Sequence, residues 1–544
     1  MVLREKSSKQ KQMGAYCTPP ELAYRMTDIL TKGRNITTAL EPSCGEGVFI
    51  EALYKTIGKK EIRTTAVEIN PEETTKLKEK WKDFPEVTIY NEDFFSFCQK
   101  HKSDRYDLII GNPPYIRYQY LSRNQREEVS ELLKEHGMKA NKLSNAWVGF
   151  MTACIAMLGE AGQIAFVIPA EIIHVSYAME LREYLLRELS SITLVWFREN
   201  VFPGLQQEVL IFIGEKGKEK KGIRIVELED ISQLTKIRLK TRNYQEVRSM
   251  EKKWTCYYLT EAENALISKI RADKRFQKLS DVSTINIGIT TGNNKYFAVN
   301  RETAELYDLK NISVPLISKG TQIHSACFSE KDWECNRDSG KPVYLVNFPD
   351  CPVSQYTKRQ QAYIEIGKKN GYDKGYKCSI RARWYQVPYI CSPDAFFLRR
   401  SQQYPRFTLN QSESVCTDSL HRVNFAAGTE PEYIILSYYN SISFAFTELC
   451  GRSYGGGVLE LFPTETGNIY LPVLNEISDK AVKNMLQQVD AFVREDNIEA
   501  ALDLVDTQVL QKQLGIPEQS CMIARNIWKK LRKKGQRKTI CSKQ

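Results

Sequence analysis

Four short apolar segments in the first part of the chain are each followed by a polar or glycine-containing turn. They occupy residues 37–40, 64–68, 87–90 and 107–110, and helix-like segments such as 48–57 and 72–82 lie between them. Strands separated by helices cannot pair as tight hairpins, so this alternation predicts parallel βαβ units and an α/β fold. In such a sheet the carboxyl ends of the strands meet at one edge, where ligands bind. The residues that follow these strands are therefore the first candidates for a functional site.

The first three strand ends carry groups suited to a nucleotide-like ligand. The first is followed by Gly45 and Gly47 in a short loop, and glycines let a backbone approach a ligand closely. The second ends in Glu68, at a spacing typical of an acidic residue that accepts hydrogen bonds from both ribose hydroxyls. The third is followed by Asp93 and Phe94, a carboxylate and an aromatic edge. A G-x-G loop alone is weak evidence, but the order of these features predicts a nucleotide-type cofactor.

The fourth strand is followed by Asn112-Pro113-Pro114-Tyr115. Each proline lacks an N–H, fixes its own φ and restricts the residue before it, so Asn112 and Pro113 should be extended with outward-pointing carbonyl groups. An amide oxygen, a rigid carbonyl and a phenol ring can together hold the amino group of a flat ring, with two acceptors for its two hydrogens. The ordinary alternative is a strand-ending turn with a half-buried tyrosine.

Length and composition narrow the class of protein further. The chain has 544 residues, enough for about two or three domains, and a formal charge of +11, which favours a polyanionic partner. No apolar run approaches membrane-spanning length, and residues 1–13 are polar and basic, so we expect a cytoplasmic protein without a signal peptide. The 14 cysteines include no C-x-x-C pair and the five histidines show no metal-ligand spacing, so we predict no metal site.

Together these motifs resemble a known family, the gamma class of S-adenosylmethionine-dependent DNA adenine-N6 methyltransferases, which are the modification enzymes of type II restriction systems. Gly14-Ala15-Tyr16-Cys17-Thr18-Pro19 is similar to the family's motif ten, and Glu41-Pro42-Ser43-Cys44-Gly45-Glu46-Gly47 to its motif one. Motif ten precedes the glycine loop, as the gamma order requires. Asn112-Pro113-Pro114-Tyr115 matches the catalytic tetrapeptide without departure, and the resemblance continues through the strand at 209–213.

The resemblance implies a Rossmann-like methyltransferase fold, S-adenosylmethionine as cofactor and a target adenine flipped out of double-stranded DNA. It implies catalytic roles for Asn112, Pro113, Pro114, Tyr115 and Phe202, with Tyr115 and Phe202 stacked on the two faces of the adenine. Considered alone, Phe202 would be an ordinary hairpin aromatic. The implied cofactor-binding residues are Tyr16, Thr18, Glu41, Pro42, Ser43, Cys44, Gly45, Gly47, Glu68, Asp93, Phe94 and Asn112.

The rest of the chain has a different texture, with short β-like runs and many turns. We predict a catalytic domain at 1–225, a mixed, β-rich DNA-recognition domain at 226–475 and a helical C-terminal region with a basic tail at 476–544. Residues 285–297 form a candidate hairpin, 145–158 a candidate amphipathic helix, and 525–538 a phosphate-seeking helix or a disordered basic arm. The first of these segments, with 314–320 and 454–460, loosely resembles the recognition region of larger gamma enzymes.

Two runs that interleave basic and aromatic residues are candidates for DNA contact. The residues concerned are Arg381, Arg383, Trp384, Arg399 and Arg400. Ordinary cation–π and surface pairing is the alternative. The resemblance implies double-stranded DNA as the partner and an enzyme that can act as a monomer. We expect the cognate restriction endonuclease to be a separate chain, because motif ten begins near Gly14 and leaves no room for a preceding nuclease domain.

Three other functions remain open. Protein-glutamine N5 methyltransferases share the tetrapeptide, although the basic–aromatic second half and the early motif ten argue against them. Cytosine-N4 DNA methyltransferases perform closely related chemistry but more often have serine at position 112. A DNA-binding specificity protein could keep the fold without binding a cofactor.

Overall fold

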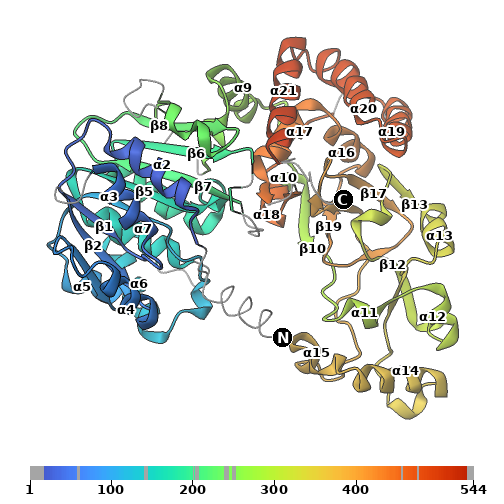
Figure 1. Ribbon diagram of the computed structural model, residues 1–544. Helices are drawn as coiled ribbons and strands as arrows, with labels where there is room; N and C mark the ends of the chain where they lie inside the picture. Colours follow the sequence, from blue (N-terminus) through green and yellow to red (C-terminus); the bar gives the residue numbers. More distant parts are fainter. Residues whose placement is uncertain are drawn as a thin grey trace. The chain divides into compact units, whose positions relative to one another are not determined.

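The computed structural model describes residues 17–57, 62–139, 145–199, 201–202, 208–237, 244–247, 253–454, 458–474 and 477–535. The chain divides into two units, Met1–Tyr258 and Leu259–Gln544 (Figure 1). Position 225, where the sequence places the end of the catalytic domain, lies inside a strand, and the first unit continues beyond it. Within the described residues, no helix is long and apolar enough to cross a membrane.

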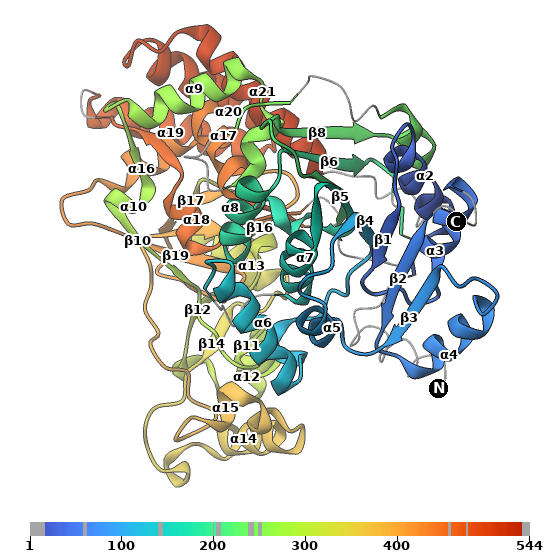
Figure 2. The same ribbon diagram turned by 90° about the vertical axis from the view of Figure 1, so that its left-hand side faces the viewer.

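One eight-stranded sheet organises the first unit. Its strands are β1 (Thr38–Glu41), β2 (Arg63–Glu68), β3 (Val87–Asn91), β4 (Tyr106–Gly111), β5 (Leu158–Pro169), β6 (Ser191–Phe197), β7 (Val209–Glu215) and β8 (Gly222–Leu228). Their order is β3-β2-β1-β4-β5-β7-β6-β8 (Figure 2). All neighbouring pairs are parallel except those that β7 makes with β5 and β6. The predicted, mostly parallel α/β sheet is therefore confirmed.

Helices cover both faces of this sheet because its strands alternate their side chains between two apolar layers. On β4, Ile110 joins the cluster that contains Leu22 and Phe49, whereas Ile109 joins the cluster that contains Phe97 and Trp147. The first cluster lies under α2 (Pro20–Thr31) and α3 (Val48–Ile57), with α4 (Pro71–Lys80) packed beside α3. The second lies under α5 (Phe94–Lys100), α6 (Arg123–Glu135), α7 (Ala146–Ala156) and α8 (Met179–Glu188).

The prediction of an amphipathic helix at 145–158 is wrong in character. Helix α7 is present, but every residue from Ala146 to Ile155 is buried. It lies between β5 and helices α5, α6 and α8, so it has no solvent-facing side. A helix that is apolar all round is the expected solution for such a central position.

The second unit contains four smaller sheets. The five-stranded sheet has the order β10 (Ser283–Ile287), β19 (Leu420–Phe425), β15 (Ala395–Leu398), β17 (Phe407–Gln411) and β13 (Cys327–Ser329). The four-stranded sheet has the order β11 (Ala298–Val299), β14 (Tyr344–Val346), β12 (Ser313–Ile317) and β18 (Val415–Cys416). A three-stranded sheet contains β16 (Arg400–Ser401), β21 (Val458–Glu460) and β20 (Arg452–Tyr454), and a two-stranded sheet contains β22 (Tyr470–Pro472) and β9 (Phe276–Lys278).

The predicted hairpin at 285–297 does not form. Strand β10 instead pairs antiparallel with β19, more than a hundred residues later, and residues 294–297 form the short helix α11 (Asn294–Phe297). This pairing adds β10 to the edge of the five-stranded sheet, so a distant strand rather than a local turn supplies its hydrogen-bond partners. Residues 455–457, in the segment 454–460 that loosely resembles the recognition region of larger gamma enzymes, lie outside the described residues.

The remaining helices all belong to the second unit. They are α9 (Glu261–Ala272), α10 (Leu279–Val282), α12 (Arg301–Leu306), α13 (Glu330–Asp338), α14 (Lys358–Lys369), α15 (Tyr376–Ser379), α16 (Pro431–Tyr438), α17 (Ser441–Cys450), α18 (Pro463–Gly467), α19 (Asp479–Arg494), α20 (Ile498–Val505) and α21 (Glu518–Gly535). The last helices pack on the large apolar cluster of this unit, which includes Leu486, Leu502 and Trp528. The predicted C-terminal helices are thus confirmed.

The basic tail, residues 525–538, begins within helix α21. Arg525 lies on α21 and pairs with Asp506 at 2.9 Å and with Glu499 at 2.8 Å. Asp506 is 5% exposed and also accepts hydrogen bonds from the Ser441 N–H and hydroxyl groups. The first basic residue of the tail therefore neutralises a buried carboxylate.

We expect Arg525→Ala to lower the free energy of unfolding by about 3–5 kcal/mol, because it leaves the Asp506 carboxylate buried without its cation. Denaturant unfolding of the full chain measures this loss. Lys529→Ala is the matched control, since Lys529 pairs with Glu499 at 3.0 Å and both side chains are 44% exposed. That variant should change stability by less than about 1 kcal/mol. Equal losses in the two variants would contradict the assignment.

Candidate active site

The glycine loop and the tetrapeptide predicted from the sequence lie where the chain order of the sheet reverses. The reversal lies between β1 and β4. From there β1, β2 and β3 follow one another toward one edge of the sheet, and β4 and β5 lead toward the other edge. In open α/β sheets the carboxyl edge at such a switch point is the usual ligand site. The glycine loop follows β1, and Asn112 follows β4, the neighbour of β1.

The glycine loop lies against Glu68 at the end of β2. The Gly45 N–H donates to Glu68 Oε2 at 2.8 Å, and the Asn70 N–H donates to Oε1 at 2.8 Å. Gly45 and Gly47 have φ angles of +51° and +76°, which disfavour other residues. A Cβ at Gly47 would also lie 2.7 Å from Leu77 Cδ2. Glycine is therefore required here, and each Glu68 oxygen has further acceptor capacity.

Glu41 and Cys44 lie behind this loop. The Glu41 side chain is 1% exposed and its carboxylate accepts from the Ile50 N–H at 3.2 Å, in the first turn of α3. Burial raises the pKa of Glu41 well above its ordinary value. Cys44 is 3% exposed, and burial raises the pKa of its thiol. These side chains hold the loop and the start of α3 in place from inside the protein.

Asp93 and Phe94 follow β3. Asp93 caps α5, since Oδ1 accepts from the Phe95 N–H at 2.9 Å, and its Oδ2 accepts from Gln125 Nε2 at 2.7 Å. The Phe94 ring is 3% exposed and stacks on Phe150 with centroids 4.7 Å apart. The carboxylate is thus fixed at the sheet edge, whereas the predicted aromatic edge belongs to the apolar core.

Asn112 is held by hydrogen bonds on both sides of its amide. Its Nδ2 donates to the Thr18 hydroxyl at 3.2 Å, and its Oδ1 lies 3.0 Å from the Tyr115 hydroxyl. That hydroxyl also lies 3.0 Å from the Val167 carbonyl oxygen on β5. Ser43 of the glycine loop donates to the Asn112 carbonyl at 3.3 Å. The motif-ten segment, the glycine loop and the tetrapeptide therefore meet at Asn112.

Thr18 does not cap α2, although it directly precedes the two prolines at the start of this helix. The N-cap position of α2 is Pro19, and no side-chain cap hydrogen bond is present there. Thr18 is 7% exposed and its hydroxyl is directed at Asn112 instead. Tyr16, the other predicted cofactor residue of motif ten, lies outside the described residues.

Phe202 belongs to a different apolar layer from Tyr115. It is 5% exposed and packs in the cluster under α2 and α3, whereas Tyr115 packs against the cluster on the opposite face of the sheet. Residues 203–207, which follow it, lie outside the described residues. The two rings predicted to stack on the target base thus belong to two different apolar clusters in this structure.

Two contributors to the site gave no signal in the sequence. The Val167 carbonyl is a backbone group on β5, and Gln125 is one of many polar residues on α6. Both act across more than thirty residues of chain, so only the folded sheet identifies them.

The five candidate DNA-contact residues all make internal contacts. Arg399 and Arg400 each donate through Nε to Glu460 Oε1, at 3.0 and 2.8 Å, and Glu460 is fully buried. Arg383 pairs with Asp350 at 2.9 Å. Arg381 donates to the Thr290 carbonyl at 3.3 Å, and the Trp384 ring lies 4.8 Å from that of Tyr296. These contacts are of the kind that the alternative interpretation, ordinary pairing within the unit, predicts.

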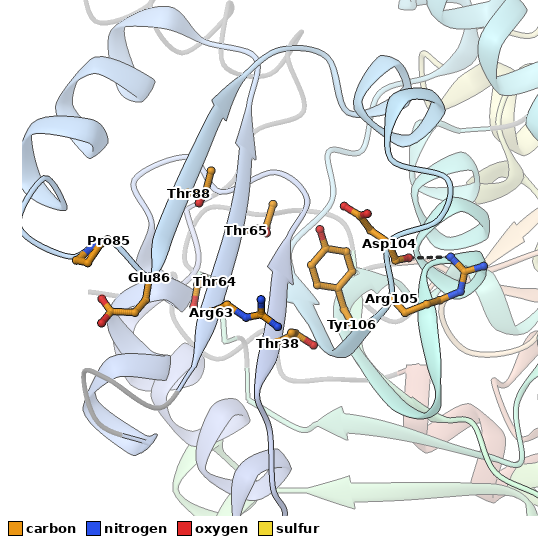
Figure 3. A pocket seen from close by; sticks show the side chains of 10 residues that line it. All are labelled: Thr38, Arg63, Thr64, Thr65, Pro85, Glu86, Thr88, Asp104, Arg105 and Tyr106. Carbon is orange, nitrogen blue, oxygen red and sulfur yellow. Dashed lines mark hydrogen bonds between the residues drawn. The ribbon is translucent and has the colours of Figure 1, made fainter.

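A separate pocket of about 530 Å³ lies at the opposite, amino edge of the same sheet (Figure 3). Thr38, Arg63, Glu86 and Tyr106, from the starts of β1 to β4, are among its lining residues. Strand starts do not carry the glycine loop or the tetrapeptide, so this pocket is distinct from the candidate active site. Within the part of the chain that the structure describes, no group of three or more His, Cys, Asp or Glu residues could hold a metal ion.

Comparison with known proteins shows which families and relatives this chain is similar to. The family model of the Eco57I restriction-modification methylase matches residues 34–202, and that of the C-terminal domain of type II methyltransferase M.Eco57I matches residues 251–510. The type II methyltransferase M.AccI of Acinetobacter calcoaceticus is 28% identical over 70% of this chain and 69% of its own length. M.XamI of Xanthomonas campestris pv. amaranthicola is 24% identical over 85% and 86%, and M.HindII of Haemophilus influenzae is 27% identical over 59% and 62%.

Two solved structures share the fold over most of the chain. The type IIL restriction-modification enzyme MmeI, in complex with DNA, has a TM-score of 0.58 and 11% identity over 91% of this chain and 73% of its own. The DrdV–DNA complex has a TM-score of 0.51 and 10% identity over 90% and 58%. Because the sequence identities are this low, the similarity establishes a shared fold and nothing further.

The sheet, its glycine loop and the tetrapeptide at its carboxyl edge define an S-adenosylmethionine-dependent methyltransferase fold followed by a mixed second unit. The predicted fold class is confirmed. The chain belongs to the type II restriction-modification DNA methyltransferases, because the two Eco57I models match it in succession and its curated relatives are type II methyltransferases. The resemblance seen in the sequence is thereby confirmed at the level of this family.

Proposed function

We propose that the protein transfers a methyl group from S-adenosylmethionine to N6 of an adenine flipped out of double-stranded DNA. The observation that carries this proposal is the set of three hydrogen bonds that hold Asn112 at the end of β4, beside the glycine loop. An amide oxygen and the adjacent Pro113 carbonyl are the two acceptors that an exocyclic amino group needs. We further propose that the chain acts as a monomer and protects DNA from a separate restriction endonuclease.

The cofactor site proposed here is the glycine loop with Glu68. The residues fit such a group because Gly45 and Gly47 keep the loop free of side chains and Glu68 presents a carboxylate beside it. When bound, S-adenosylmethionine supplies an electrophilic methyl group on a sulfonium. We propose that Glu68 accepts from the ribose hydroxyls, that Asp93 accepts from the adenine of the cofactor, and that Pro42 and Ser43 line the site. Glu41, Cys44 and the Phe94 ring act from behind by positioning the backbone.

Glu68→Gln should weaken S-adenosylmethionine binding by about tenfold, because an amide has one acceptor oxygen in place of two and serves both the backbone N–H groups and the ribose hydroxyls less well. Isothermal calorimetry on the folded variant measures this change. Glu72→Gln, an exposed acidic residue in the first turn of α4, is the control and should bind as the wild type does. Unchanged affinity in Glu68→Gln would remove Glu68 from the ribose.

The catalytic step depends on the geometry of the acceptors. The lone pair of a purine amino group is delocalised into the ring, so the nitrogen is a weak nucleophile. Acceptors at Asn112 Oδ1 and the Pro113 carbonyl hold its two hydrogens and favour a tetrahedral nitrogen with its lone pair directed at the methyl group. The methylated ammonium that forms is strongly acidic and loses its proton to water, so no acidic general base is needed.

Tyr115 serves this arrangement in two ways. Its ring is placed to stack on the flipped base, and its hydroxyl has one hydrogen to donate. Donation to the Val167 carbonyl, 3.0 Å away, leaves Asn112 Oδ1 to the target amine. Phe202 would cover the other face of the base after leaving its apolar cluster, and Pro114 keeps the Pro113 carbonyl extended.

The proposal is tested by incubating the purified protein with unmethylated plasmid and S-adenosylmethionine, followed by modification-sensitive sequencing. N6-methyladenine at one short motif is the expected result. N4-methylcytosine in place of methyladenine would support the cytosine-N4 alternative, and labelled methyl groups on protein alone would support glutamine methylation. DNA that stays unmodified in the presence of bound cofactor would contradict the proposed substrate.

A further inference from the structure

The long connection between β14 and β15 forms a separate surface feature of the second unit. Residues 358–390, here called the lobe, contain α14, a short 3-10 turn at Tyr372–Lys374, α15 and an irregular segment. In both views the lobe lies at one end of this unit, opposite α19, α20 and α21 (Figures 1 and 2).

The outer surface of the lobe is strongly basic. The segment contains eight Lys or Arg residues and two acidic ones. The exposed basic residues are Lys358, Arg359, Lys368, Lys369, Lys374 and Lys377. Lys368 pairs with Glu365 at 2.8 Å. Such an excess of exposed positive charge in one segment fits a polyanion.

The lobe also exposes large apolar side chains. The described residues expose eleven large hydrophobic side chains, and three of them, Tyr376, Ile380 and Tyr389, lie in the lobe at 74%, 62% and 90% exposure. Tyr389 also has a φ of +58°, in the left-handed region that residues with a large side chain rarely adopt. Backbone strain of this kind concentrates at binding sites, because the surrounding structure must enforce it.

Aromatic contacts attach the lobe to the rest of the second unit. Tyr363 stacks on Tyr296 with centroids 4.7 Å apart, and its hydroxyl donates to the Tyr296 carbonyl at 2.6 Å. Trp384 packs on the same ring, and the Arg381 guanidinium lies 5.5 Å from the Phe297 ring. Arg381 and Trp384, two of the residues that the sequence singled out for DNA contact, thus help to fix the lobe to the unit.

We propose that the outer face of the lobe binds double-stranded DNA, with its lysines on phosphates and Tyr389 and Tyr376 against sugars and base edges in a groove. This inference rests on the proposed function and adds the surface that contacts the substrate. Phosphate contacts supply affinity, and a rigidly presented aromatic side chain supplies apolar contact inside a groove.

The first test neutralises charge. Lys374→Gln/Lys377→Gln should weaken binding of a duplex that contains the methylated motif by about fivefold to tenfold, and should reduce the slope of log K against log salt by up to about 2. Lys480→Gln/Lys483→Gln on α19 is the matched control, since it removes two exposed lysines elsewhere in the unit and should keep both values. Fluorescence anisotropy at several salt concentrations gives both quantities.

The second test uses the strained backbone. Tyr389→Gly relieves the positive φ, so the melting temperature should stay constant or rise, while affinity for the duplex should fall by about tenfold. Glu413→Gly relieves a similar φ of +52° at another exposed position of this unit and should not lower the affinity. If Tyr389→Gly is as stable as the wild type but binds DNA more weakly, the loss of affinity reflects a lost DNA contact and not a folding defect.

The outcomes distinguish this inference from the function on which it rests. A wild-type protein that neither binds nor methylates DNA would overturn the proposed function itself. A wild-type protein that methylates DNA, with wild-type DNA affinity in Tyr389→Gly and in the lysine variant, would overturn only the lobe assignment. Binding of an acidic protein by the lobe, with unchanged DNA affinity, would also overturn it.

Discussion

Asn112→Ala should lower the rate of methyl transfer by roughly a thousandfold, the effect expected when a preorganised polar group at the reacting atom is removed. The amide oxygen is one of two acceptors for the target amino group, and alanine offers no replacement. Cofactor binding should be largely retained, because the glycine loop and Glu68 are held by each other. Single-turnover transfer to the target duplex measures the rate, and calorimetry measures cofactor affinity.

Asn112→Ser is the informative companion to this variant. Serine keeps a hydroxyl oxygen near the target nitrogen but shortens the side chain, so it should recover part of the lost rate. Both variants should unfold at temperatures close to that of the wild type, since Asn112 is only half-buried. Full turnover by Asn112→Ala would overturn the proposed grip on the amino group.

Thr18→Val should lower transfer by about tenfold to a hundredfold while leaving S-adenosylmethionine affinity nearly unchanged, because a misdirected acceptor shifts the bound geometry. The Thr18 hydroxyl accepts from Asn112 Nδ2 at 3.2 Å, so it fixes which end of the amide faces the target base. Valine has the same shape without the hydroxyl, and the amide can then rotate to present its NH₂ group. We therefore propose Thr18 as a positioning residue for Asn112, in place of the cofactor contact that the family resemblance implied.

The discriminating measurement for Thr18 compares the rate constant with the cofactor affinity. Thr18→Ser keeps the hydroxyl and should restore most of the rate, which a general packing defect would not allow. A large loss of cofactor affinity in Thr18→Val, with the rate at saturation unchanged, would instead assign Thr18 to the cofactor. Melting temperatures of the two variants serve as the control for folding.

Local sequence patterns were sufficient for much of the first unit. Helix α3 has the bounds predicted from periodicity, and β1 to β4 lie at the predicted segments, because each combines an apolar run with a turn residue that ends it. The predictions failed where contacts with segments distant in the sequence determine the local structure. Strand β10 pairs with β19 rather than in the predicted hairpin, and α7 is buried all round rather than amphipathic.

The sequence by itself determined the parallel sheet, the glycine loop and the tetrapeptide, because these depend on periodicity and on backbone restrictions of Gly and Pro that act within a few residues. The tertiary structure decided which groups support Asn112, since Thr18 and Val167 reach it from distant segments. It also decided that Arg381 and Trp384 face an aromatic cluster while Tyr389 is exposed. Side-chain direction across long separations depends on packing, which no local pattern encodes.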